Sequence, residues 1–251
     1  MFIKDLHTPH LIKRGRIKLS KPIAIILAII FLALGFASVF IFLIPNLGAG
    51  LSRRTYYILT LGTTTNLVQA ENLSTQVKNG GGGGFIINDG IFHVTAAVYK
   101  DRLDAESVAA RMMNEFDAEV LTINIPRKRI RGLNTHQDNR SFRNILLFSI
   151  ELVDFIVYQN LKLDTNETTD SAIIYLLNTR LPLIKDNIIK LENLIYQHYQ
   201  HQFLINTLEF YLNFYSDFYY MISIISGDGL VTHRLKYFAV KYILKYSDLI
   251  S

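Results

Sequence analysis

The apolar positions of this chain repeat with two different periods, and the change falls near residue 127. Between residues 55 and 126, stretches rich in strand-forming residues alternate with segments whose apolar residues recur every three or four positions, as in amphipathic helices. The predicted elements are a strand over 56–61, a helix from Asn66 that Gly80 ends, strands over 85–88 and 91–99 around Asp89-Gly90, a helix from Asp101, and a strand over 119–125. This β-α-β-β-α-β order predicts a four-stranded sheet with two helices on one face and the other face open.

Residues 141–251 have a helical period throughout. Helices are predicted near 141–161, 169–198, 201–225 and 232–250, with Pro182 kinking or splitting the second one. Their apolar stripes predict a small antiparallel bundle. The third of these helices is unusually aromatic, which indicates core packing, with a groove for a protein partner as the alternative.

A run of 22 residues without a charge, 23–44, is long enough to cross a bilayer core of about 30 Å. We therefore predict a single transmembrane helix; a cleaved signal peptide is the alternative. Basic residues are denser before this run than after it, so the N-terminus is expected in the cytoplasm and residues 45–251 outside it, on a single-pass protein of the cell membrane.

Charge and cysteine content narrow the function classes. Six of the 26 basic residues and one of the 21 acidic residues precede residue 22, so the remainder is balanced at 20 of each and gives no case for nucleic-acid binding. The basic tail is read as a topology signal rather than as a lipid-binding element. The chain has no cysteine, which fits export without disulfides and excludes thiol peptidases.

Five consecutive glycines, 80–84, raise the question of a phosphate-binding loop. Such loops leave a strand and open a helix, whereas here a predicted helix comes first and a strand follows. No Lys-Ser or Lys-Thr pair follows Gly84 either. The run is therefore predicted to serve chain geometry, and alanine there should lower stability.

Two stretches, YYILTLGTTTNLVQAENL and GGGGFIINDGIFHVTAAVYKDRLDAESVAARM, resemble the SPOR (sporulation-related) domain family in their order and spacing. The resemblance covers residues 55–126. It implies binding of peptidoglycan glycan strands stripped of their stem peptides, often at division septa. It also places glycan contacts on the first strand, the following loop and the third strand. Several SPOR proteins of Gram-positive relatives have similar helical C-terminal parts.

Strand alternation sorts the candidate contacts on the open face. Tyr57, Leu59 and Leu61 should face the helices, and so should Phe92, Val94, Ala96 and Val98. The glycan-binding residues predicted on the opposite face and in the loop are Tyr56, Ile58, Thr60, Thr64, His93 and Thr95. The alternatives for Tyr56 and His93 are an edge-covering tyrosine and a solvated strand histidine. Thr60 and His93 depart from the glutamine and arginine common in the family, and the chain has no tryptophan for stacking.

No catalytic or metal site is predicted. His198 and His201 lack a third well-placed ligand, and no carboxylate pair fits a glycosidase. No cofactor is expected. The basic segment 127–131 is read as a solvated hinge, or alternatively as a site for anionic wall polymers or lipid headgroups.

The predicted fold class is α+β with six parts: a basic tail (1–22), a transmembrane helix (23–44), a linker (45–54), a SPOR-like domain (55–126), a basic linker (127–140) and a helical domain (141–251). The predicted function is membrane-tethered, non-enzymatic peptidoglycan binding linked to cell division or sporulation, with possible protein partners on the helical domain. The alternative is a protein-interaction scaffold that acts through the helical domain and has lost glycan binding.

Overall fold

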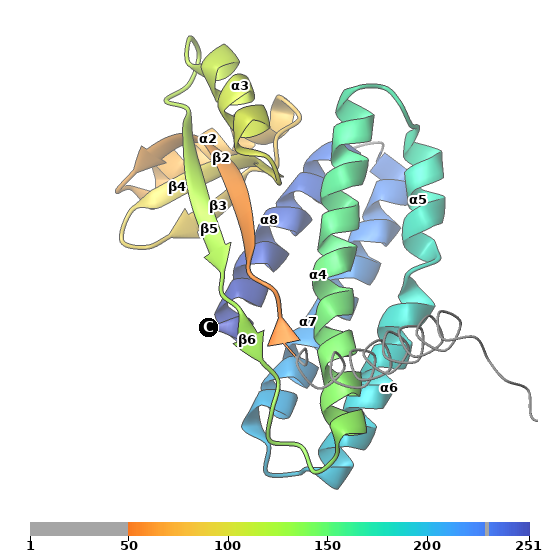
Figure 1. The fold of residues 1–251 in the computed structure, drawn as a ribbon. Coiled ribbons are helices and arrows are strands. Elements are labelled where there is room, and N and C mark those ends of the chain that lie inside the picture. The colour runs from red at the N-terminus through yellow and green to blue at the C-terminus, as the bar shows by residue number, and fades with distance from the viewer. Residues whose placement is uncertain (1–49, 229–230) are drawn as a thin grey trace, which may run out of the picture. The chain divides into compact units, whose positions relative to one another are not determined.

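Four antiparallel strands form a sheet with the order β3-β4-β2-β5 (Figure 1). The computed structural model describes residues 50–228 and 231–251. In chain order the sheet and its two helices comprise β2 Arg54–Thr64, α2 Leu67–Asn79, β3 Phe85–Asn88, β4 Phe92–Tyr99, α3 Arg102–Met112 and β5 Glu119–Ile125. The predicted β-α-β-β-α-β order is present.

Helices α2 and α3 pack on one face of the sheet over a small core. Leu59 and Leu61 of β2 contribute to it together with alanines of both helices, as strand alternation predicted. The Asn66 side chain accepts hydrogen bonds from the backbone N–H groups of Val68 and Gln69 and so begins α2, as its capping sequence predicted.

Five helices follow the sheet: α4 His136–Asp164, α5 Asp170–Asn178, α6 Leu181–Gln197, α7 Gln202–Asp228 and α8 Val231–Ile250. Pro182 lies in the first turn of α6, where its missing N–H costs nothing, so the long predicted second helix is split in two. A second, two-stranded sheet pairs β1 Gly50–Leu51 with β6 Lys128–Arg129. Lys128 and Arg129 of the basic segment 127–131, which was read as a solvated hinge, are therefore paired in a short sheet.

The second face of the four-stranded sheet is covered, because α8 packs across it (Figure 1). Tyr56, Ile58 and Val98 belong to the same buried core as Leu235 and Phe238 of α8. The predicted open face is thus an interior face, and the prediction was wrong on this point. Helices α2 and α3 cover one face. The sequence pattern does not show that α8, about 130 residues after α3 in the chain, covers the other.

One strand residue points the opposite way from its prediction. Leu59 pairs with Ala97 and Thr60 with Thr95, so Ala96 is left without a partner in a β-bulge. A bulge shifts the alternation of every residue beyond it. Val98 therefore faces α8, and not α2 and α3 as predicted.

The predicted fold class requires correction. The described chain is mixed α/β and mostly helical, with the sheet and the long helices sharing one core. Across residues 50–228 and 231–251, every helix is too short or too polar to cross a membrane. The predicted transmembrane segment, 23–44, lies outside the described residues.

The glycine run lets three parts of the chain approach closely. A Cβ on Gly83 would lie 2.9 Å from the backbone nitrogen of Tyr237 in α8, and one on Gly82 would lie 2.5 Å from the Val77 side chain. Gly84 has a φ of +63°, which non-glycine residues rarely adopt. Gly80 ends α2, as predicted, with a φ of −84°, so it does not adopt the left-handed conformation that glycine often has at this position. The architectural role predicted for the run agrees with this geometry.

We expect Gly83→Ala to lower the free energy of unfolding by about 1–3 kcal/mol, because the added methyl group forces the backbone of α8 away from the loop. Gly80→Ala is the matched control: its Cβ would meet no atom closer than 3.6 Å. This control should change stability by less than about 1 kcal/mol. Urea unfolding of both variants measures the difference, and equal effects would show that α8 does not press on the loop.

Asp217 of α7 links this helix to α8. Its carboxylate accepts hydrogen bonds from the Tyr242 hydroxyl and from Lys241 Nζ, the latter at 2.6 Å. Burial alone would raise the pKa of Asp217, but the bonds from Lys241 and Tyr242 outweigh it and hold that pKa below its usual value. The folded state therefore favours the ionised carboxylate.

Because the pKa of Asp217 is lower in the folded than in the unfolded chain, its contribution is fully present above its usual pKa near 4 and is lost as the pH falls from there through the lower pKa of the folded state. Asp217→Asn should thus be less stable than wild type at pH 7, and the difference should shrink below about pH 4. Thermal unfolding between pH 7 and pH 3 tests this. Asp186→Asn, at an exposed carboxylate, is the control, and a pH-independent difference for Asp217→Asn would contradict the assignment.

Candidate functional site

Four of the six predicted glycan contacts are inside the protein. Tyr56, Ile58, Thr60 and Thr95 each have 0% exposed surface. Strand alternation assigned Tyr56, Ile58 and Thr60 to the face opposite α2 and α3, and they do lie there, but α8 and α4 cover that face. These residues hold the sheet on the helices and cannot contact a glycan in this structure.

Tyr56 binds a carboxylate of the bundle. Its hydroxyl donates a hydrogen bond of 2.8 Å to Asp154 Oδ1 of α4, while Arg54 and Lys100 bind Oδ2 of the same side chain. Burial, and then the neighbouring Asp154, raises the pKa of Tyr56 well above its usual value, so the phenol stays a donor. Three groups of the sheet region thus converge on one carboxylate of α4.

Thr60, Thr64 and His93 also have local partners, whereas the buried Thr95 Oγ1 makes no hydrogen bond to a described residue. Thr60 Oγ1 donates to the backbone oxygen of Glu119, and Thr64 Oγ1 is bonded to the Gln69 side chain next to the cap of α2. His93 Nε2 lies 3.2 Å from Asp89 Oδ1, and its side chain is 14% exposed. Only Thr64 and His93 therefore reach the surface, and they do so apart from the cavity described next.

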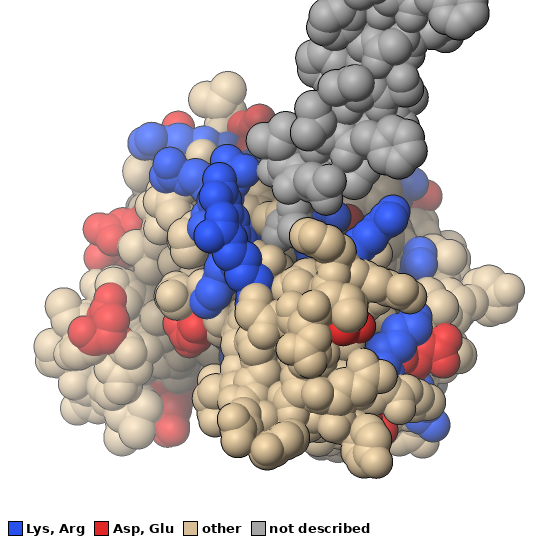
Figure 2. Space-filling model, turned by 60° about the horizontal axis from the view of Figure 1, so that its bottom comes forward, with Lys and Arg blue, Asp and Glu red and all other residues tan. Residues whose placement is uncertain are grey.

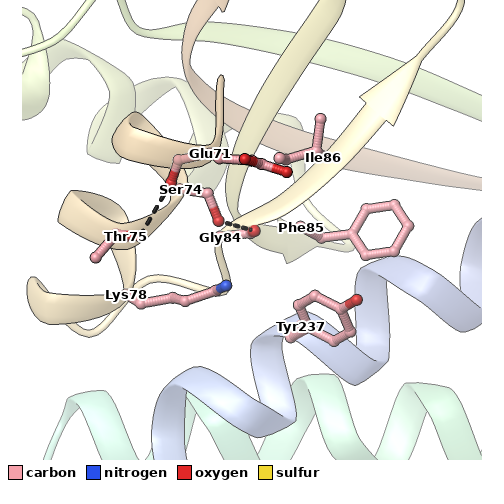
Figure 3. Close-up of a pocket in the computed structure, with 8 residues that line it drawn as sticks. All are labelled: Glu71, Ser74, Thr75, Lys78, Gly84, Phe85, Ile86 and Tyr237. Carbon is pink, nitrogen blue, oxygen red and sulfur yellow. Dashed lines mark hydrogen bonds between the residues drawn. The ribbon is translucent and has the colours of Figure 1, made fainter. Parts of the chain in front are cut away.

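A cavity of about 390 Å³ lies at the edge of the sheet, where β3 passes between α2 and α8 (Figure 3). Its walls come from three segments that are distant in sequence. They are Glu71, Ser74, Thr75 and Lys78 of α2, Gly84, Phe85 and Ile86 at the end of the glycine run, and Tyr237 of α8. The sheet edge, one face of α2 and a residue of α8 therefore make one recess.

Helical spacing aligns the polar wall. Glu71, Thr75 and Lys78 are four and three residues apart, so they lie on one face of α2. Ser74 Oγ donates a hydrogen bond of 2.6 Å to the Gly84 carbonyl and fixes the start of β3 against the helix (Figure 3). Thr75 Oγ1 donates to the Glu71 carbonyl of its own helix. Within the described chain, the Glu71 carboxylate makes no hydrogen bond or ion pair, so it is available to a ligand.

Two aromatic rings form the apolar wall. Phe85 and Tyr237 meet edge to face with centroids 5.1 Å apart, and Tyr237 is 37% exposed. The Lys78 ammonium lies 5.9 Å from the centre of the Tyr237 ring, at the distance of a cation–π contact. Gly83 makes this wall possible, because its missing side chain lets the Tyr237 backbone lie against the loop.

Lys78 and Glu71 supply the charged groups of the recess. His233 is one helical turn before Tyr237, and burial, then Arg234 and Lys78, lower the pKa of this histidine. Its imidazole is therefore neutral at pH 7. A ligand in the recess meets one cation, one carboxylate, a hydroxyl and an exposed aromatic ring, which is the mixture that polar molecules with apolar faces require.

Metal chemistry has no support within the described residues, which contain no cluster of three His, Cys, Asp or Glu side chains able to hold an ion. His198 of the pair considered above lies 3.2 Å from Asp138 Oδ2. His201 packs edge to face against Phe142. Both histidines are therefore held by contacts within the protein.

The sequence did not identify this recess. The period of α2 placed Glu71, Thr75 and Lys78 on one face, and the glycine run placed a loop beside them. Nothing in the sequence showed that Tyr237, more than 150 residues away, would form the opposite wall.

Comparisons with known proteins found few similarities. No family model and no curated protein matches the chain. One solved structure, the peptidoglycan-binding domain of the B. subtilis cell wall lytic enzyme CwlC in solution, is 24% identical over 28% of this chain and 90% of that chain, with a TM-score of 0.25. At this TM-score the likeness supports no conclusion about function.

We expect Tyr56→Phe to lower the free energy of unfolding by about 1.5–3 kcal/mol, because a buried hydrogen bond to the Asp154 carboxylate is lost. Tyr57→Phe is the matched control. The Tyr57 hydroxyl makes no hydrogen bond to any described residue, so its removal should cost less than about 0.5 kcal/mol. Urea unfolding distinguishes them, and a neutral Tyr56→Phe would mean that the sheet face opens in solution.

Proposed function

We propose that this protein binds the glycan strands of cell-wall peptidoglycan and that the recess between α2, β3 and α8 is the binding site. One observation carries the proposal: an exposed aromatic ring, Tyr237, lies opposite a row of polar side chains on α2 at the mouth of a cavity of about 390 Å³. The sequence resemblance to the SPOR family supplies the substrate class. The limited likeness to the CwlC domain is not needed for it.

The chemistry of the recess suits an amino sugar. A pyranose ring has a C–H face that packs on an aromatic ring, and its rim carries hydroxyl and acetamido groups that need hydrogen-bond partners. Tyr237 would take the C–H face, while Glu71 and Thr75 accept hydrogen bonds from hydroxyl and amide groups. Lys78 donates to hydroxyl or carboxylate oxygens. The outer edge of β3 adds backbone groups that no strand of this sheet pairs.

We further propose that the protein binds without cleaving. Glycoside hydrolysis commonly uses two carboxyl groups on either side of the scissile bond. The residues that line the recess include one carboxylate, Glu71. Binding at the wall places the described part of the chain outside the cytoplasm. The preference for strands stripped of stem peptides and the link to division or sporulation belong to the proposal through the family resemblance.

Co-sedimentation with purified wall sacculi tests the proposal. The protein should sediment with sacculi whose stem peptides an amidase has removed, and less with intact sacculi. Tyr237→Ala and Lys78→Gln should each weaken binding about tenfold or more, which corresponds to about 1.4 kcal/mol.

The matched control is Tyr220→Ala on α7, whose side chain is 64% exposed and lines no part of the recess. It should bind like wild type. Circular dichroism and urea unfolding show whether each variant is folded. No binding to either kind of sacculus would favour the scaffold alternative. Full binding by both recess variants would place the glycan site elsewhere.

A further inference from the structure

Four arginines lie along the strand pair β1–β6 and the turns next to it. Arg127, Arg129 and Arg131 are exposed, whereas Lys128 is half-buried and Ile130 is buried. This alternation is that of an extended strand, so the three arginines share one face at a spacing of about 6.6 Å. Arg53, also exposed, donates to the Asn124 side chain on the neighbouring strand. We call Arg53, Arg127, Arg129 and Arg131 the arginine strip.

The strip has a fixed backbone. Gly50 pairs with Arg129 and Leu51 with Lys128, and Arg143 of α4 donates a hydrogen bond of 3.0 Å to the Gly50 carbonyl. Lys128 turns inward, where its ammonium donates to the Ile250 carbonyl at 2.8 Å and lies 4.5 Å from the Phe203 ring centre. The guanidinium groups therefore project from a strand that is tied to two helices.

No carboxylate of a described residue pairs with any arginine of the strip. Among the described side chains, the one that accepts a hydrogen bond from the strip is Asn124, whose amide oxygen is bonded by Arg53. Figure 2 shows a band of basic side chains on this side of the molecule, with acidic side chains to its left and both kinds to its right. Uncompensated charges at this spacing lie within one Debye length of each other, so their fields add.

The segments that carry the strip expose no large apolar side chain. The large apolar side chains exposed on the described chain include none from residues 50–54 or 124–143. A surface that inserts into a bilayer places aromatic or aliphatic side chains beside its basic ones. A dissolved polymer needs only the row of charges, and the straight row of the strip matches a chain of anions better than a plane of them.

From these observations we propose that the arginine strip binds a linear polymer of phosphate or phosphodiester groups. Each guanidinium offers a planar fork of donors that fits two oxygens of one phosphate. Because the strand is already ordered, binding costs little conformational entropy of the backbone. The strip is distinct from the recess, so this second ligand does not depend on the proposed glycan function.

Binding of fluorescent inorganic polyphosphate to the full-length protein tests the proposal. Four neutralised phosphates predict that the logarithm of the association constant falls with the logarithm of salt concentration with a slope of about −3 for a single-stranded polyanion. The double variant Arg127→Gln, Arg129→Gln should bind about tenfold or more weakly, and its slope should be shallower by about 1.4.

The control variant Arg111→Gln, Lys190→Gln removes the same charge from exposed positions on α3 and α6 and should bind like wild type. Basic residues before residue 22 are present in all three proteins and cancel from the comparison. Should the double variant fail to fold, Arg131→Gln alone provides the measurement, with a smaller loss in the same direction.

Three results would overturn the proposal. The first is equal polyphosphate binding by the strip variant and the control. The second is binding of poly-glutamate as tight as that of polyphosphate, which would show that any linear anion suffices. The third is strip-dependent binding to vesicles of acidic phospholipid with no binding to polyphosphate, which would assign the surface to a membrane.

Discussion

The structure depends on the burial of the second face of the sheet by α8. Tyr56 and Ile58 of β2 have no exposed surface, and they share a core with Phe238 and Tyr242 of α8. Burying one such side chain contributes about 1.5–3 kcal/mol. Because several of them are buried together, their sum is comparable with the whole free energy of unfolding of a typical domain. Asp154 adds polar specificity because three groups of the sheet region bind its carboxylate. The sheet and the bundle therefore fold as parts of one core.

Covering that face determines where a ligand can bind. A split βαβ sheet with only two helices would offer a broad open surface, and the polar residues of its strands would be the natural contacts. Here those residues are interior, and the accessible parts of the sheet are its two edges, β3 and β5. The helix that removes one surface also creates another, because Tyr237 of α8 supplies the aromatic wall of the recess. The glycine run accommodates both, since Gly83 lies directly against α8.

Local features of the fold could be predicted from the sequence, whereas long-range packing could not. Capping by Asn66, the split at Pro182 and the orientation of Leu59 and Leu61 follow from chemistry within a few residues. The bulge at Ala96 could not be foreseen, because alternation assumes an unbroken register. Nor could the cover over the sheet: the apolar stripe of α8 shows that one face is buried, but not what it is buried against. Tyr56, Ile58, Thr60 and Thr95 are buried for this reason, although strand alternation assigned them to a common face.

The recess also links binding to the integrity of the fold. Its α2 and β3 walls belong to the sheet region and its Tyr237 wall to the last helix, so only the docked arrangement presents both. A ligand that contacts both walls binds the docked state and not an undocked one, and it therefore stabilises the contact between α8 and the sheet by mass action. Conversely, a change that loosens α8 anywhere along its core lowers affinity without touching the ligand. Ligand binding in the recess and docking of α8 on the sheet therefore stabilise each other, because both free energies depend on the same helix.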